Sequence, residues 1–292
     1  MTPELPVVSS GDLTATINPL GAELWSLRDR AGRELMTDAD PRWWTGRAPI
    51  LFPFVGRCRG DRYRLGGRDY AMPQHGFARR RQFSLVAHSA TRAVFRLAAD
   101  AETRRIYPFE FSLEMSFDVD GPDLRIATRV ANEGDTAMPF SFGFHPAFAW
   151  PLPYGGAIDE HRILFDGPEP AALREVDRES GLIAAAPRPS PVVGRRLVPT
   201  HKMFERDALI WDRLNSRSLS WGAAGSPNLR ISFPDTPWLG VWQKPGARYL
   251  CIEPWAGMAD PAGFAGEVWD KPGIIALPPE GVRSFRLGVS LE

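Results

Sequence analysis

The chain has 292 residues, of which 43% are hydrophobic and 24% charged, so it can bury a sizeable core. Its 35 basic and 35 acidic residues cancel, which argues against nucleic acid or an anionic membrane as the main partner. Two cysteines are too few for a disulfide framework, and the sequence shows neither a signal-peptide pattern nor a membrane-spanning apolar stretch, so we expect a cytoplasmic protein.

Proline bears most directly on the fold class. The chain has 28 prolines spread over its length, and long helices do not survive that spacing, because proline removes a donor and clashes with the preceding turn. Short strands joined by turns tolerate it. The longest proline-free interval, residues 74–107, has no helical pattern, and apolar residues such as Phe83, Leu85 and Ala87 favour strands there.

Period-two alternation predicts strands along the whole chain. The first two lie at residues 13–17 and 23–27. The clearest pattern covers residues 109–130, where apolar and polar residues alternate on both sides of a turn at residues 120–123, as in an antiparallel hairpin with one face in a core. Three further strands are predicted at residues 229–233, 249–253 and 285–291, and the last of them is expected to close a sheet.

No feature of the sequence marks a domain boundary. Residues 168–200, rich in Pro, Ala and Arg, break the strand pattern, but it resumes afterwards without a change of composition, so we expect a long loop inside one domain. We find no repeat of solenoid or propeller period. The sequence therefore predicts a single all-β domain over residues 1–292, with two large antiparallel sheets packed as a β-sandwich.

Several common functional motifs are absent from the sequence. It contains no dinucleotide-binding glycine fingerprint, no P-loop, no H-E-x-x-H, no C-x-x-C and no G-x-S-x-G. The usual NAD-dependent, nucleotide-binding, zinc-protease and α/β-hydrolase functions are thereby disfavoured. Five scattered histidines give no support to a transition-metal site, and we expect neither a metal nor a cofactor.

Four segments differ from ordinary strand sequence. They read WWTGRAPILFPFVGR at 43–57, PQHGFAR at 73–79, FGFHPAF at 142–148 and CIEPW at 251–255. Each places an ionisable residue among aromatic residues, Gly and Pro. Burial among rings shifts the pKa of a carboxylate or imidazole, which acid–base catalysis requires, and rings beside polar groups suit the C–H faces and hydroxyls of a sugar.

With these four segments, from about residue 21 to its C-terminus, the chain resembles the aldose 1-epimerase (mutarotase) family, in particular its bacterial LacX-like branch. The resemblance implies a galactose mutarotase-like supersandwich, in agreement with the fold class reached from proline and alternation. It also implies an isomerase that interconverts the α and β anomers of free aldohexoses. Opening a cyclic hemiacetal needs one base and one acid and moves no hydride or group, so no cofactor is implied.

The resemblance also assigns roles to particular residues. Glu253 would be the general base and His145 the general acid, while His75 would hydrogen-bond the sugar and stabilise charge in the open form. The family positions that bind substrate match Arg57, Arg79 and Asp207. Asp212 remains a rival to Asp207, and Arg57 could instead brace a loop by pairing with a carboxylate.

The other histidines and the cysteines have bland interpretations. His88, His161 and His201 lack a comparable context, so we expect them at the surface. Cys58 and Cys251 fall inside or beside the four segments, and we interpret them as small buried thiols.

Two alternatives to a free-sugar mutarotase stay open. The first is a mutarotase for hexose 6-phosphates, in which two or more arginines hold the phosphate. The second is a non-catalytic carbohydrate-binding sandwich, although pure binding needs neither an acid nor a base. The sugar and the oligomeric state do not follow from the sequence.

Overall fold

The structure is a computed structural model that describes residues 4–292. Its largest sheet has nine strands. Their order is β15-β14-β17-β18-β22-β10-β9-β8-β7, and neighbours pair antiparallel. These strands are β7 (Ser84–His88), β8 (Arg92–Ala98), β9 (Phe111–Asp120), β10 (Asp123–Asn132), β14 (His161–Phe165), β15 (Arg196–Leu197), β17 (Ser218–Ala223), β18 (Leu229–Ser232) and β22 (Val282–Leu291).

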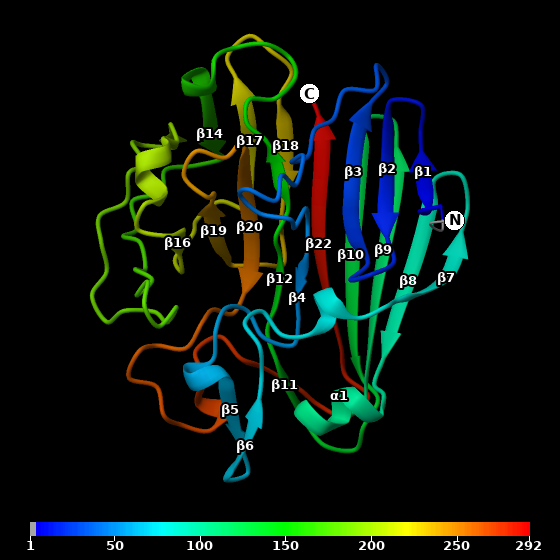
Figure 1. Ribbon diagram of the computed structural model, residues 1–292, viewed down its shortest axis with the longest axis vertical. Helices are drawn as coiled ribbons and strands as arrows, with labels where there is room; N and C mark the ends of the chain where they lie inside the picture. The colour runs from blue at the N-terminus through cyan, green and yellow to red at the C-terminus, as the bar shows by residue number, and fades with distance from the viewer. Residues whose placement is uncertain (1–3) are drawn as a thin grey trace.

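Two smaller sheets lie side by side over one face of this large sheet (Figure 1). One has the order β16-β19-β20-β12-β4, with β13 also pairing to β20, and the other has the order β1-β2-β3. Their strands are β1 (Val7–Ser9), β2 (Leu13–Asn18), β3 (Glu23–Asp29), β4 (Ile50–Leu51), β12 (Phe142–Phe144), β13 (Ala147–Ala149), β16 (Leu209–Trp211), β19 (Trp238–Trp242) and β20 (Tyr249–Ala256).

Aromatic side chains join the layers. Phe142 of β12 stacks on Phe285 of β22 at 4.8 Å between ring centroids, and Trp211 of β16 meets Phe165 of β14 at 5.9 Å. A contiguous cluster of buried apolar residues extends from Val8 to Val289, so the sheets share one core. The predicted all-β sandwich is confirmed, with the second layer made of two sheets.

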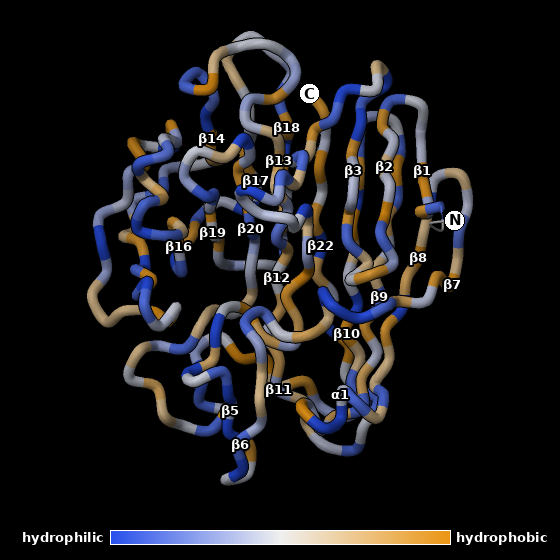
Figure 2. Tube along the Cα trace, in the orientation of Figure 1, coloured by the Kyte–Doolittle hydropathy of each residue, from blue (hydrophilic) through white to orange (hydrophobic). Residues whose placement is uncertain are grey.

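The alternation that predicted the hairpin of residues 109–130 has the expected register. β9 and β10 pair with Val119 opposite Leu124 and Phe117 opposite Ile126, and these four side chains are buried. Figure 2 shows apolar and polar positions following one another along the strands of the large sheet. The strands predicted at residues 13–17, 23–27, 229–233, 249–253 and 285–291 correspond to β2, β3, β18, β20 and β22.

The proline-free interval contains a short α-helix that the sequence analysis missed. Helix α1 (Ala101–Ile106) lies near its end. The Asp100 side chain accepts hydrogen bonds from the backbone N–H groups of Glu102 and Thr103, and this cap starts the helix. Six residues are too few to show the helical periodicity on which the prediction depended.

Short elements complete the chain at the ends of the sheets. They are the hairpin strands β5 (Arg62–Leu65) and β6 (Arg68–Ala71), the paired strands β11 (Met138–Phe140) and β21 (Ile275–Leu277), and the 3₁₀ helices η1 (Arg59–Asp61), η2 (Ala78–Arg80), η3 (Ile158–Glu160), η4 (His201–Phe204) and η5 (Val268–Asp270). Between residues 4 and 292, no helix is long and apolar enough to cross a membrane.

Residues 168–200 form the long loop that we expected, because β15 is the sole named strand that the structure assigns between them. We call this segment the excursion. The excursion is nevertheless tied to the rest of the fold. The Ile183 N–H donates to the Asp260 carbonyl at 2.9 Å, and the Ala262 N–H donates to the Ile183 carbonyl at 2.8 Å. These bonds hold the excursion against the chain that follows β20.

Candidate active site

A cavity of about 280 Å³ opens on the six-stranded sheet, and five of the six residues predicted as site residues line it. They come from separate parts of the chain, which the fold brings together: His75 and Arg79 from the segment after β6, His145 from the break between β12 and β13, Asp207 from the turn before β16, and Glu253 from β20.

Strand register places His145 opposite Glu253. On one side of the break, Gly143 in β12 pairs with Trp255, and on the other side Ala147 in β13 pairs with Cys251. His145 therefore occupies the position facing Glu253, where Pro146 interrupts the ladder and its carbonyl accepts the Ile252 N–H at 3.1 Å. The interruption leaves both side chains directed to the cavity that they line.

His145 and Glu253 form a buried acid–base pair. Nε2 of His145 lies 3.2 Å from Oε2 of Glu253, and the two residues are 7% and 2% exposed. Burial lowers the pKa of the imidazole, and the positive charge of Arg79 lowers it further. Burial likewise raises the pKa of the carboxyl well above its usual range, and the negative charge of Asp207 adds to the effect. Both directions favour the uncharged pair, which shares one proton.

Backbone geometry fixes the orientation of His75. This residue has a left-handed φ of +65°, and Gly76 follows at +70°, where a Cβ would lie 2.1 Å from the Phe52 carbonyl oxygen. The Gly56 N–H donates to Nδ1 of His75 at 3.1 Å, so the proton of the neutral ring belongs on Nε2. Burial lowers the pKa of His75 well below its usual value, which makes it a neutral hydrogen-bond donor.

Asp207 rather than its rival Asp212 lines the cavity. Asp207 has a φ of +75°, and its Oδ1 accepts the N–H of Ala208 at 2.7 Å. Asp212 instead pairs with Arg174 at 2.6 Å between Oδ2 and Nε. The turn that carries Asp207 is linked to the excursion by Glu175, whose carboxylate pairs with Arg206 at 2.8 Å.

The two predicted arginines differ in position. Arg79 lines the cavity and donates through Nη2 to the Gln74 carbonyl at 2.8 Å. Arg57 is outside the lining; its Nε lies 3.1 Å from Oδ1 of Asp61, and its Nη1 donates to the Ser180 carbonyl at 3.4 Å. These contacts match the bracing alternative, because they connect the first signature segment to the excursion.

Other parts of the cavity wall were not predicted. Trp44 and Trp242 line it, as do Val176 and Ile183 of the excursion. Trp44 lies in the first signature segment, so a signal existed, whereas the excursion has no pattern that would assign its apolar residues to a site. Trp255 also lines the cavity, as a ring packed against the strand glycines: a Cβ on Gly143 would lie 2.5 Å from it.

The expectations for the remaining histidines and the cysteines have mixed outcomes. His161 is fully buried, against the prediction, because its Nε2 accepts the Leu152 N–H at 2.9 Å and its Nδ1 faces the Ala157 carbonyl at 2.9 Å. His201 is partly buried, with its ring 5.1 Å from that of Trp150, and His88 is exposed as predicted. Both cysteines are buried thiols, which confirms that interpretation.

Three potential metal ligands meet at the pair. His145, Cys251 and Glu253 offer atoms within 4.8 Å of one another. A tetrahedral zinc site could use this set of donors, but an ion there would occupy both members of the acid–base pair. The donor set does not by itself require a metal, because the pair already satisfies the His145 and Glu253 atoms that face each other.

We therefore predict that any proton-transfer activity of this pair survives removal of divalent metals. The protein would be dialysed against EDTA, and the rate of the reaction it is found to catalyse would be compared with that of an untreated sample and of a sample to which zinc has been returned. Equal rates before and after chelation are expected, because proton transfer by His145 and Glu253 needs no Lewis acid. A rate that falls on chelation and returns with one divalent ion would contradict this prediction.

Comparisons with known proteins show which family this chain is similar to. A family model described as aldose 1-epimerase matches residues 6–188. The chromosomal and plasmid LacX proteins of Lactococcus lactis subsp. lactis are each 30% identical over 276 residues, which cover 91% of this chain and 92% of the relative. LacX is a name that states no activity.

Solved structures are similar over the whole chain. A galactose mutarotase-like protein from Lactobacillus casei has a TM-score of 0.92 at 28% identity and covers 99% of this chain and 100% of its own. A galactose mutarotase related enzyme from Lactobacillus acidophilus has a TM-score of 0.88 at 27% identity, with 98% and 96% covered. Both similarities extend over nearly the whole of this chain, so the fold as a whole is shared.

Proposed function

The chain belongs to the aldose 1-epimerase family, and we propose on that basis that it is a mutarotase, an isomerase that interconverts the α and β anomers of free aldohexoses. The observation that carries the proposal is the buried pair of His145 and Glu253, which lie 3.2 Å apart and line a cavity of about 280 Å³. A protein that only binds a sugar needs no such pair.

The reaction requires two proton transfers and no other chemistry. The C1 hydroxyl of the cyclic sugar loses its proton, the freed electron pair forms the C1 carbonyl, the C1–O5 bond breaks, and O5 gains a proton. Rotation about C1–C2 presents the other face of the carbonyl, and closure by the reverse steps yields the other anomer. One general base and one general acid suffice.

Glu253 is the proposed base and His145 the proposed acid. In the reactive form, Glu253 is a carboxylate and His145 an imidazolium, which attract each other at 3.2 Å. Ring opening moves one proton from O1 to Glu253 and one from His145 to O5, so the pair becomes uncharged. Because burial disfavours both charges, ring opening discharges an ion pair that the site holds at a high free energy.

The remaining residues position the sugar. His75, whose ring is oriented by the Gly56 N–H, donates through Nε2 to the oxygen on which negative charge develops as the C1–O5 bond breaks. Asp207 and Arg79 bind hydroxyls from the cavity wall. Arg57 acts through its contacts with Asp61 and the Ser180 carbonyl, which hold the excursion beside the cavity.

Polarimetry tests this proposal directly. Freshly dissolved α anomers of glucose, galactose, xylose and arabinose would be followed to equilibrium with and without enzyme. We expect a faster approach to an unchanged equilibrium rotation for at least one sugar, with a rate proportional to enzyme concentration. Rates equal to the uncatalysed ones across the panel, with sugar binding retained, would favour the non-catalytic carbohydrate-binding sandwich instead.

The choice between free and phosphorylated sugars depends on the arginines. A phosphate dianion is best held by two or more guanidinium groups, and Arg79 is the arginine that lines the cavity, while Asp61 offsets the charge of Arg57. We therefore predict that kcat/KM for glucose or galactose equals or exceeds that for glucose 6-phosphate, at low and at moderate salt.

A hexose 6-phosphate mutarotase would give a different result in the same assay. It would prefer the phosphate ester strongly, the preference would weaken with added salt or inorganic phosphate, and Arg57→Ala or Arg79→Ala would abolish it. Arg92→Ala is a matched control, because Arg92 pairs with Asp118 on the large sheet and lies outside the cavity lining.

A further inference from the structure

The two histidines of the cavity are held in different ways. His75 is oriented by a hydrogen bond from the Gly56 N–H to its Nδ1. Within residues 4–292, no other residue bonds to the buried Nδ1 of His145, which faces only the backbone carbonyl of its own residue, so the ring's polar contact with another residue is made through Nε2 with Glu253. Functional histidines are usually oriented by a hydrogen bond to the second ring nitrogen, and here another contact must do this.

Aromatic rings surround His145 at this point. The indole of Trp44 stacks on the imidazole, with ring centroids 5.0 Å apart and planes 28° apart. Trp242 meets the imidazole edge-on at 6.0 Å, and His75 does so at 5.8 Å. Trp44 is supported in turn by Trp242 at 5.7 Å and by Tyr249 at 5.8 Å.

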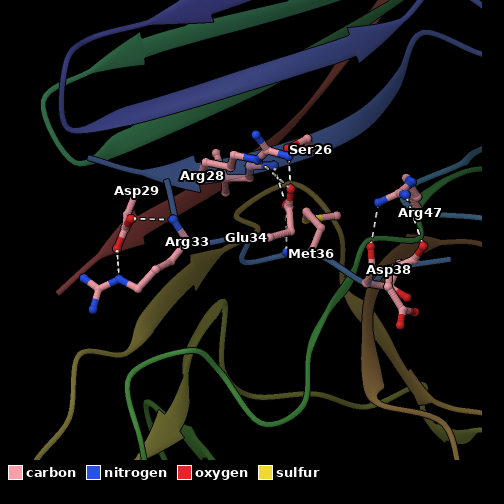
Figure 3. Close-up of polar contacts among 10 residues, drawn as sticks. Ser26, Arg28, Asp29, Arg33, Glu34, Met36, Asp38 and Arg47 are labelled. Carbon is pink, nitrogen blue, oxygen red and sulfur yellow. Dashed lines mark hydrogen bonds and ion pairs between the residues drawn. The ribbon is translucent and has the colours of Figure 1, made fainter. Parts of the chain in front are cut away.

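The loop that carries Trp44 is anchored at both ends. Arg47 donates to the carbonyl of Thr37 at 2.6 Å and to that of Asp38 at 3.2 Å, and Figure 3 shows its guanidinium reaching back to Asp38. The Glu23 carboxylate accepts the N–H groups of Arg47 at 2.7 Å and of Ala48 at 2.8 Å. These bonds close the loop on itself and fix where its indole lies.

We propose that Trp44 is the positioning residue of His145: its indole holds the imidazole against Glu253 and stabilises the imidazolium from which O5 receives its proton. The inference rests on the proposed function. The face of an indole attracts a cation, and it does so most strongly where water is excluded. Trp44 therefore favours the charged form of the pair over the uncharged form, without supplying a polar group that would compete for the proton.

Other groups act on the same imidazole. Glu253 and Cys251 face it from β20, and His75 and Arg79 face it from the segment after β6. The backbone carbonyl of His145 raises the pKa of the ring and so favours the imidazolium, whereas the burial of the ring and the charge of Arg79 lower that pKa. Trp44 adds to the first effect. Its removal would lower the affinity of His145 for a proton, so the acid limb of the kcat/KM profile would move to lower pH.

The first test compares substitutions at two adjacent tryptophans. Trp44→Phe and Trp44→Leu would be measured beside Trp43→Phe, a matched control because Trp43 packs against Gly246 and lies outside the cavity lining. We expect kcat to fall by a few-fold in Trp44→Phe and by about tenfold or more in Trp44→Leu, the range of a buried cation–π contact. The acid limb should shift with Trp44→Leu, and Trp43→Phe should change neither quantity.

A packing or sugar-stacking role would give another pattern. It would raise KM or lower Tm in the Trp44 variants and leave the acid limb where it is, and that result would overturn the proposal. A variant that keeps the shape of the indole separates a loss of catalysis from a loss of folding. With a fluorinated tryptophan at position 44 alone, whose ring face attracts cations less, kcat should fall while KM and Tm stay at their wild-type values.

The second test does not depend on catalysis. In the NMR spectrum, the ring protons of His145, assigned by their loss in His145→Asn, should carry a ring-current shift from Trp44 that disappears in Trp44→Leu and persists in Trp43→Phe. An unchanged shift in Trp44→Leu would overturn the proposal. If the wild-type enzyme showed this shift but catalysed no mutarotation, the proposed function would be wrong while the contact between the two rings stood.

Discussion

Replacement of Glu253 by glutamine is expected to reduce kcat by about two to four orders of magnitude, the usual contribution of a general base. The amide has the size of the carboxylate and can still contact His145, but it cannot accept the proton of the C1 hydroxyl. Glu253 is buried in the middle of β20, and the substitution leaves the backbone pairing of this strand unchanged. The shape of the cavity should therefore be retained, and sugar affinity should stay close to normal.

The matched control is Glu169→Gln. Glu169 is also a buried glutamate, at 1% exposure, but it accepts the N–H groups of Asn215 and Ser216 and lies outside the cavity lining. Its replacement is expected to lower stability through those hydrogen bonds, while kcat should be retained. Turnover near the wild-type rate in Glu253→Gln would remove Glu253 from the role of base.

Replacement of His145 by asparagine should reduce kcat by a similar factor, since the amide can donate a hydrogen bond to O5 but cannot give up the proton that O5 needs when the C1–O5 bond breaks. Rates would be measured with the sugar that the wild-type enzyme turns over best, and folding would be checked by the unfolding midpoint. The control is His161→Asn, because His161 is a buried histidine whose ring bonds to Leu152 and Ala157 away from the cavity. An active His145→Asn enzyme would contradict the assignment.

The pH profile of the wild-type enzyme follows from the same pair. Activity requires His145 and Glu253 to hold one proton between them. The pair loses this proton at alkaline pH and gains a second one at acid pH, and either change stops the reaction. Burial lowers the pKa of His145 and raises that of Glu253, so both limbs of kcat/KM move outward. The profile should be flat through pH 6.5, where an unperturbed histidine titrates. An inflection there would mean that the imidazole titrates as an exposed one does.

Local pattern predicted the strands well because strand alternation records burial on one face. Residues 109–130 show this most clearly, since the alternating apolar residues of β9 and β10 predict the face of the hairpin that is buried in the core. Two of the four segments singled out in the sequence contain His145 and Glu253, which both line the cavity. The distance between them could not be predicted, because it depends on β12 and β13 pairing with β20 on both sides of a strand break.

Features that depend on long-range contacts were missed. Ile183 reaches the cavity because a run without strand pattern is bound to the chain after β20. Arg57 is near the cavity but outside its lining, with its guanidinium contacting Asp61 and the Ser180 carbonyl, and His161 is buried because two backbone groups satisfy its ring. Ser180 lies 123 residues from Arg57, so spacing along the sequence does not identify it as a partner. Asp61 follows Arg57 by four residues, and its pairing with an arginine of this segment could be predicted. Trp44 differs from them, since its segment was singled out while its contact with His145 was not.

The most direct measurement of the central claim is magnetisation transfer between the H1 signals of the α and β anomers in a sugar solution already at equilibrium. No net reaction occurs there, so the transfer reports the interconversion rate alone. We predict enzyme-dependent exchange that disappears in the Glu253→Gln and His145→Asn variants and persists in Glu169→Gln and His161→Asn. Exchange that continues undiminished in both pair variants would show that the buried acid–base pair does not open the ring.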